Sequence, residues 1–160
     1  MPRSSMATFS ALWRAYGEGR LDRALHLVDP DCEVTLPDGR TTFRGHDGIR
    51  ECLDVAHREW RMLSVTYDDI HEERPAIIVG IGRVAASGPD GRGGFERPLA
   101  CVAEFRDGRF VRGWMFGDPA RAIDHARTVD DERTAAEREA AEREANAASG
   151  PGGGPAPGRR

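Results

Sequence analysis

Apolar residues recur at helical spacing near the start of the chain. A first stripe has the spacing i, i+3, i+4, i+7, which is typical of one face of an α-helix, and consists of Phe9, Leu12, Trp13 and Tyr16. A second stripe with the same spacing runs from Leu21 to Val28 and is followed by Asp29-Pro30, a helix-ending signal. The pattern predicts two short amphipathic helices, with Ser4 or Ser5 as the N-cap of the first.

A short hairpin and a longer helix are predicted next. Residues 32–36 alternate as a strand, Pro37-Asp38-Gly39 is a turn signal, and residues 41–43 form the return strand. A third helix is expected over residues 46–60. Its buried stripe consists of Ile49, Cys52, Leu53, Ala56 and Trp60.

The hydrophobic period changes to two after residue 61, which predicts strands. Four are expected, over residues 62–73, 76–86, 95–106 and 109–117, with a tight turn at Asp107-Gly108 between the last two. Asp118-Pro119 then opens a short helix that reaches about residue 126. Helices gathered before an antiparallel sheet indicate an α+β fold rather than an alternating one.

The composition changes after residue 128. Residues 130–148 are rich in Ala, Glu and Arg, which favours a helix with almost no apolar face. Residues 149–160 are rich in Gly and Pro, which predicts disorder. We therefore expect one domain over residues 5–128 and an extension over residues 129–160. The extension is interpreted as solvated and dispensable, with partner binding as the alternative.

Composition and charge narrow the classes of partner. A chain of 160 residues with 39% hydrophobic residues suits one domain with one core, and a net charge of -4 gives no footprint for nucleic acid. No apolar run approaches the ~20 residues that span a bilayer, and no signal-peptide pattern opens the chain. The three scattered cysteines, Cys32, Cys52 and Cys101, indicate a reduced protein. We expect a cytoplasmic protein that binds neither nucleic acid nor membrane.

Two motifs carry a resemblance to a known superfamily. FRGHDGIREC spans the hairpin-to-helix junction at residues 43–52, and FRDGRFVRGWMFGDPARAIDHA covers residues 105–126. With the element order, they resemble the nuclear transport factor 2-like superfamily, and most of all its SnoaL-like branch, over about residues 5–127. The resemblance implies a cone made by a curved sheet wrapped on helices. Relatives include isomerases, polyketide cyclases, epoxide hydrolases, dehydratases and binding modules, so the fold does not decide the function.

The catalytic set of the ketosteroid isomerases is not matched in this chain. Those enzymes use a carboxylate base just before a proline on the first hairpin, and a tyrosine and a protonated aspartate as an oxyanion hole. The resemblance places Leu36, Leu12 and Val102 at these positions. Isomerase activity on a ketosteroid is therefore not expected.

Two further enzyme relatives are matched only in part. Limonene-epoxide-hydrolase-like enzymes use an Asp-Arg-Asp set, for which the resemblance offers Arg83 but puts Ala85 and Phe116 at the aspartate positions. SnoaL-like cyclases use an acid/base aspartate in the pocket, for which Asp118 is the candidate. The alternative interpretation of Asp118 is a helix N-cap.

One sequence segment matches a cofactor-binding motif, but the residues that follow it do not fit that motif. Residues 80–85, GIGRVA, match a dinucleotide fingerprint, but a Gly-rich loop follows where the motif requires a helix. We interpret these glycines as allowing a strand to curve. The five histidines show no metal-ligand spacing, so neither cofactor nor metal is expected.

Strand alternation suggests which residues face the interior of the cone. With Arg83 facing inward, the predicted ligand pocket consists of Tyr16, Leu36, Trp60, Arg83, Val102, Arg112, Trp114 and Phe116. Candidate acid/base residues are Glu104, Asp118 and His71. A one-residue slip would invert the two faces, and an Arg83–Glu104 ion pair is the purely structural alternative.

These patterns predict a small-molecule pocket protein. The functional hypothesis is acid/base chemistry of the isomerase, cyclase or hydrolase type on an apolar small molecule, and the alternative is a non-catalytic ligand-binding or dimerisation module. Arginines in the pocket favour a ligand with a carboxylate or a carbonyl group. An apolar stripe on the predicted outer face predicts a homodimer, and it consists of Leu99, Cys101, Ala103 and Phe105.

Overall fold

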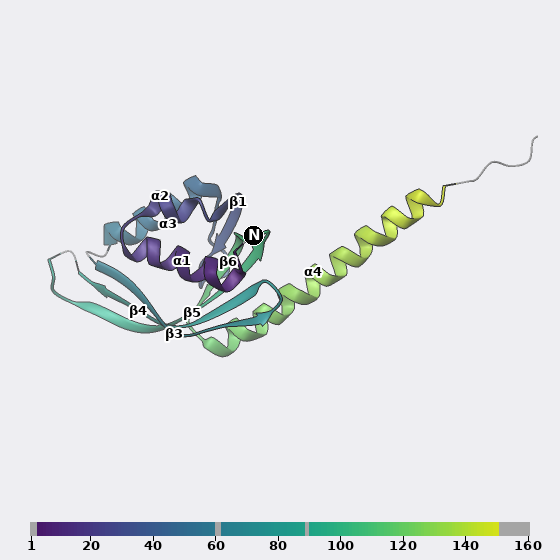
Figure 1. Ribbon diagram of the computed structural model, residues 1–160. Coiled ribbons are helices and arrows are strands. Elements are labelled where there is room, and N and C mark those ends of the chain that lie inside the picture. Colours follow the sequence, from purple (N-terminus) through teal and green to yellow (C-terminus); the bar gives the residue numbers. More distant parts are fainter. Residues whose placement is uncertain (1–2, 60–61, 89, 151–160) are drawn as a thin grey trace, which may run out of the picture.

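The computed structural model describes residues 3–59, 62–88 and 90–150 of the chain. Helices α1, α2 and α3 lie on one face of a curved sheet, and α4 lies on the other (Figure 1). The elements in chain order are α1 (Ser5–Gly17), α2 (Leu21–Leu25), β1 (Val28–Thr35), β2 (Thr42–Arg44), α3 (Gly45–Glu59), β3 (Met62–Arg74), β4 (Ile77–Ser87), β5 (Gly94–Arg106), β6 (Arg109–Phe116) and α4 (Pro119–Ala148). The α+β class is therefore confirmed.

The sheet has six strands in the order β2-β1-β6-β5-β4-β3. Neighbouring strands are antiparallel except β1 and β6, which run parallel. Strands β3 to β6 follow one another as a meander, as the period-two pattern predicts. A two-residue turn joins β5 to β6, with positive φ at Asp107 (52°) and Gly108 (74°), the geometry that such hairpins prefer.

The first helix begins as its sequence predicts. Ser4 is the N-cap, and its side chain accepts a hydrogen bond from the backbone N–H of Ala7. The second helix is shorter than expected, because α2 ends at Leu25 and Val28 already belongs to β1. Val28 is 3% exposed and packs in the core below α1. Pro30 is tolerated in this strand because the register with β6 is interrupted between Val28 and Glu33, so its missing N–H breaks no regular ladder.

The sheet is buried on both faces. One core lies between the sheet and α1 to α3, and its buried members include Phe9, Ile78 and Phe105. The other lies under α4, where Ala122, Ala126 and Val129 pack on strands β4 and β5. As a result, every residue of β5 from Leu99 to Phe105 is buried, with no alternation between the two faces.

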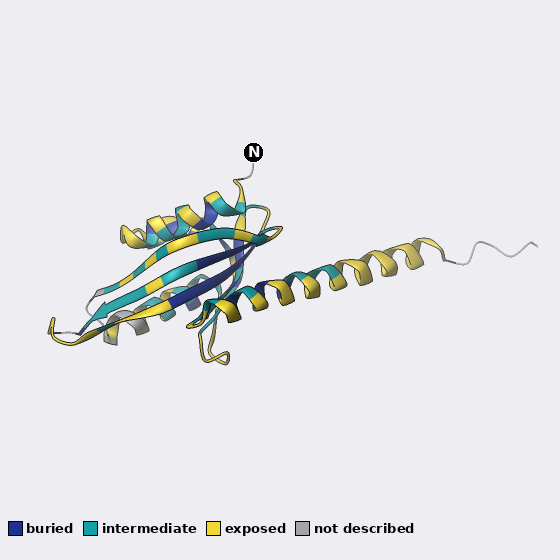
Figure 2. Cartoon of the chain, turned by 90° about the horizontal axis from the view of Figure 1, so that it is seen from below, coloured by how far each residue is buried: buried dark blue, intermediate teal, exposed yellow. Residues whose placement is uncertain are grey.

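Helix α4 differs from the predicted short helix with a separate extension. It is one helix over Pro119–Ala148, capped by Asp118, whose carboxylate accepts a hydrogen bond from the N–H of Ala120. Its first half packs on the sheet, and the half beyond residue 134 is exposed and projects away from it (Figures 1 and 2). Helix is therefore correct for residues 130–148, whereas the prediction of disorder at residues 151–160 lies outside the described residues. Within the described residues, no helix combines the length and apolarity needed to cross a membrane.

Candidate functional site

A cavity of about 270 Å³ lies between the three N-terminal helices and the concave face of the sheet. The apolar stripe of α1 forms part of its wall, with Phe9, Leu12, Trp13 and Tyr16, and α3 contributes Ile49, Cys52 and Leu53. The sheet contributes every second residue of β5 from Leu99 to Phe105, and three residues of β6, namely Phe110, Gly113 and Met115. The amphipathic pattern of α1 thus supplies the site directly, because its apolar face is the one that looks onto the cavity.

Aromatic rings fix the position of α1 above the sheet. Trp13 packs edge-on against Tyr16 and Tyr67, with ring centroids 5.7 Å and 5.1 Å apart, and Phe9 lies 5.4 Å from Tyr67. Gly80 makes room for this cluster, since a Cβ there would lie 2.8 Å from the ring of Tyr67. One glycine of the GIGRVA motif therefore serves close packing rather than nucleotide binding.

The cavity lining carries no charge. Within the described residues, every lining side chain is apolar or a neutral protic group. Burial raises the pKa of the Tyr16 hydroxyl, and the nearby Cys52 thiol raises it further. Burial likewise raises the pKa of Cys52, and it raises that of Cys101 to about 12. At neutral pH these groups keep their protons, so they can donate hydrogen bonds but cannot act as general bases.

The structure brings only part of the predicted pocket together. Tyr16 and Leu36 line the cavity, and Trp60 lies outside the described residues. The assignment of the sheet faces is inverted for the other five: Arg83, Val102, Arg112, Trp114 and Phe116 do not line the cavity. Val102, Trp114 and Phe116 belong instead to the core under α4. The physical reason is the burial of both faces, which removes the polar and apolar alternation that normally distinguishes them.

The predicted arginines and Glu104 make ion pairs away from the cavity. The carboxylate of Glu104, 3% exposed, accepts a hydrogen bond from Arg112 Nε at 2.6 Å, and the Arg112 guanidinium lies over the Trp114 ring. Arg83 is exposed and pairs with Asp68 (3.1 Å) and Glu96 (3.6 Å). The alternative Arg83–Glu104 pair is therefore not formed.

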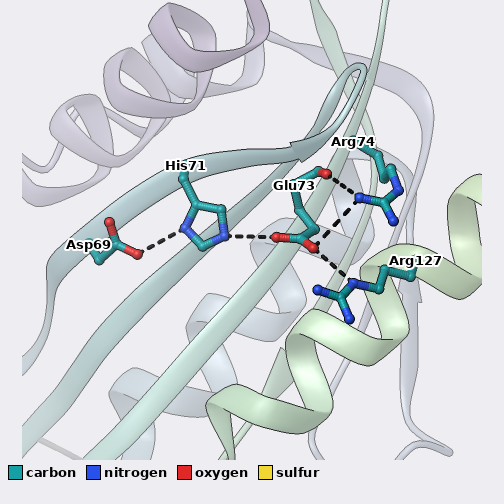
Figure 3. A network of polar contacts seen from close by, with 5 residues as sticks. All are labelled: Asp69, His71, Glu73, Arg74 and Arg127. Atoms are coloured by element: carbon teal, nitrogen blue, oxygen red, sulfur yellow. Dashed lines mark hydrogen bonds and ion pairs between the residues drawn. The ribbon is translucent and has the colours of Figure 1, made fainter.

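The other two candidate acid/base residues also lie outside the cavity. Asp118 is the N-cap of α4, as its alternative interpretation holds. His71 lies on β3 between two carboxylates, with Nδ1 2.9 Å from Asp69 and Nε2 3.1 Å from Glu73 (Figure 3). Only the protonated ring has N–H donors for both contacts.

Glu73 links this network to α4. Its second carboxylate oxygen accepts a hydrogen bond from Arg127 Nε at 2.9 Å (Figure 3). The hydrogen bond from Arg127, followed by the one from His71, lowers the pKa of Glu73. The network joins β3 to α4 on the face opposite the cavity, which is a structural role for His71.

Sequence reasoning placed several lining residues in the core without assigning them to a site. Cys52 and Trp13 were expected as members of buried helical stripes, and Cys101 was expected on the outer face. The glycines at positions 80 and 113 are the signal in the sequence that points to the cavity face, because each leaves room for an aromatic ring. A Cβ at Gly113 would lie 2.7 Å from the Phe110 ring, so this position too accommodates an aromatic side chain on the cavity side.

Solved structures with the same arrangement of elements identify the fold. A nuclear transport factor 2-like protein of unknown function from Burkholderia pseudomallei superposes with a TM-score of 0.65 at 24% identity, covering 75% of this chain and 95% of that one. TerC, co-crystallised with polyporic acid, has a TM-score of 0.65 at 19% identity and covers 75% and 98%. IdmH, a putative polyketide cyclase from Streptomyces antibioticus, has a TM-score of 0.62 at 20% identity and covers 76% and 97%. The fold is that of the nuclear transport factor 2-like proteins.

The family follows from the sequence match. The model of the SnoaL-like domain matches residues 9–113, which include most of α1, all of β1 to β5 and most of β6. The chain belongs to the SnoaL-like domain family. No curated protein matches it significantly.

Proposed function

We propose that this protein binds a neutral, largely apolar small molecule in the cavity below α1. The observation that carries the proposal is the uncharged lining, in which the described protic groups keep their protons. An anionic ligand would leave water without gaining a cationic partner, which is costly. A neutral aromatic molecule would bury its surface against the rings and aliphatic groups of the wall.

This proposal replaces the expectation of a carboxylate ligand. That expectation depended on Arg83 and Arg112, and both lie on the other face of the sheet. Two proteins with this fold support a role for small molecules: TerC was co-crystallised with polyporic acid, and IdmH is described as a putative polyketide cyclase.

Binding is better supported than acid/base catalysis. Among the described lining residues there is no carboxylate and no imidazole to accept a proton. The three acidic or basic candidates, Glu104, Asp118 and His71, are engaged in structural contacts elsewhere. The non-catalytic ligand-binding module is therefore the form of the proposal that the geometry favours.

The test compares a neutral ligand with a matched anion. Titration of the protein with 2-acetylnaphthalene and with 2-naphthoate at pH 7.5, followed by calorimetry, should show at least about tenfold tighter binding of the neutral ketone. Equal or tighter binding of the carboxylate would contradict the proposal.

A pair of variants on one strand locates the bound molecule. Val84 lines the cavity, whereas its neighbour Ala85 does not. We expect Val84→Phe to weaken binding by taking up part of the cavity and Ala85→Phe to leave it unchanged, with circular dichroism confirming that both variants fold. An affinity that is the same in Val84→Phe as in the wild type would place the ligand elsewhere.

A further inference from the structure

We propose that His125 is a pH-sensitive latch between α4 and the sheet. With a neutral ring, the first half of α4 lies against β6. Protonation of the ring weakens this contact, so that α4 separates from the sheet more often in acidic solution. The inference is independent of the proposed function, because α4 covers the face of the sheet opposite the cavity.

His125 packs against two aromatic rings below α4. The ring centroids of His125 and Trp114 are 4.7 Å apart, and those of His125 and Phe116 are 5.3 Å apart. Both aromatic residues lie on β6. The helix neighbours Ala122 and Ala126 are fully buried, so this side of α4 is pressed onto the sheet. The imidazole is therefore part of the contact that holds α4 in place.

The buried nitrogen of this ring has no polar neighbour. Nε2 of His125 is buried and, among the described residues, has no hydrogen-bond partner. A neutral imidazole tolerates this position, because only one of its nitrogens carries a proton. A protonated imidazole has an N–H on both, so its buried Nε2–H would lack an acceptor and its charge would lie against apolar rings. Burial accordingly lowers the pKa of His125.

Charged side chains near the ring oppose one another. Within the described residues, Glu132 of α4 raises the pKa of His125, whereas the Arg112 guanidinium of β6 lowers it. Arg112 is also paired with the Glu104 carboxylate of β5, at 2.6 Å. The residues of β4 that pack under α4 are apolar, namely Ile77, Val79 and Ile81. Burial is the largest influence on the pKa of His125, so the docked state favours the neutral ring.

The contact of α4 with β3 responds to acid differently. Strand β3 lies three strands away from β6, and there Glu73 pairs with Arg127 of α4 (Figure 3). His71 contacts both Asp69 and Glu73, and protonation supplies the second N–H donor that these two contacts require. Acid therefore does not weaken the β3 contact through His71. The other charged pair on this side joins Arg74 to Asp130 of α4.

Docking of α4 should be strongest above pH 6.5. Because His125 binds a proton less readily when α4 is docked, the contribution of its ring to docking is complete above the ordinary histidine pKa of 6.5 and declines as the pH falls below it. At pH 5.0 the Glu73–Arg127 pair persists, since the pKa of Glu73 is lowered. A comparison of pH 7.5 with pH 5.0 therefore tests His125 while the β3 contact is intact.

Hydrogen exchange measures how often α4 opens. After correction for the intrinsic exchange rate at each pH, the protection factors of amides at residues 122–129 should be at least about threefold lower at pH 5.0 than at pH 7.5. Those of residues 9–16 in α1 should stay within about twofold. His125→Phe keeps an aromatic ring and removes the titrating group, so it should abolish the decrease. His71→Gln, the matched control at β3, should retain it.

An NMR titration of the wild type provides a second test that needs no variant. The His125 ring should titrate with a midpoint below pH 6.5, and the amide shifts of residues 122–129 should change with the same midpoint. A midpoint at or above pH 6.5 would overturn the inference even if His125→Phe does not fold. Unchanged protection in the wild type, a decrease that persists in folded His125→Phe or disappears in His71→Gln, or an equal decrease in α1 would also overturn it.

Discussion

Among the described residues, the buried charged side chain, Glu104, lies on the side of the sheet that faces α4. Glu104 is almost fully buried there, and Arg112 is its only cationic partner within the described residues. A carboxylate in a protein interior is costly unless it is paired and hydrogen-bonded. The pair therefore stabilises the fold below α4 and has no access to the cavity, which explains why a residue with the chemistry of a general acid is structural here.

Removing one partner of this pair should be more damaging than removing both. We expect Arg112→Met to lower the free energy of unfolding by about 2–4 kcal/mol, somewhat less than for a fully buried pair because Arg112 is 38% exposed. The double variant Glu104→Leu, Arg112→Met should recover most of that loss, because it buries no unpaired charge. Urea denaturation measures the free energy of unfolding of both variants. A double variant less stable than the single one would contradict this account.

For the side chains of β5, the sequence predicts the strand but not which side chains face the cavity. The sequence identifies Cys101 and Val102 as strand residues, but both are buried, so periodicity cannot tell which one faces α1. The assignment of the two sheet faces therefore depended on Arg83, which was placed on the inner face because it matches the arginine of the limonene-epoxide-hydrolase-like enzymes. In the structure its guanidinium is exposed and paired with Asp68. Tyr16 could be placed because an amphipathic helix has a single apolar face.

Helix α4 is the element that sequence patterns describe least well. Its buried positions Ala122, Ala126 and Val129 have helical spacing, but two of them are alanines and give a weak hydrophobic signal. No Gly or Pro interrupts the chain between Pro119 and Ser149, so a continuous helix is possible through the predicted domain boundary. Ion pairs to β3 then hold its packed half, through Arg127 to Glu73 and Asp130 to Arg74. The boundaries of β3 to β6 were predictable because turn residues separate them.

Two truncations should separate the packed and projecting halves of α4. Removing residues 135–160 deletes only exposed positions among those described, so we expect the melting temperature to change by no more than about 2 °C. Removing residues 119–160 uncovers the apolar side chains of Ile77, Val79 and Val102, and we expect loss of cooperative unfolding or aggregation. Calorimetry measures the melting temperature and the cooperativity of unfolding, and light scattering detects aggregation. A stable, monodisperse protein without α4 would show that the second core is dispensable.

The whole molecule is a sheet between two helical layers, and this arrangement changes the prediction of a homodimer. The stripe on which that prediction depended, Leu99, Cys101, Ala103 and Phe105, lines the cavity. The opposite face of the same strand lies partly under α4. The physical basis for a dimer through that stripe is therefore removed, and the same side chains are available to a ligand instead.

Ligand binding should stabilise helices α1 to α3 and the sheet together. Both contribute walls to the cavity, so the cavity exists only when they are packed against each other. A ligand that binds only the folded state at one hundred times its dissociation constant adds about 2.7 kcal/mol to the free energy of unfolding. We expect 2-acetylnaphthalene to produce this increment in urea denaturation of the full chain. The same increment should appear after removal of residues 135–160, since the projecting half of α4 contributes nothing to the cavity wall. At the same ligand concentration it should be smaller in Val84→Phe, and an undiminished increment there would show that stabilisation arises from a surface site rather than from the cavity.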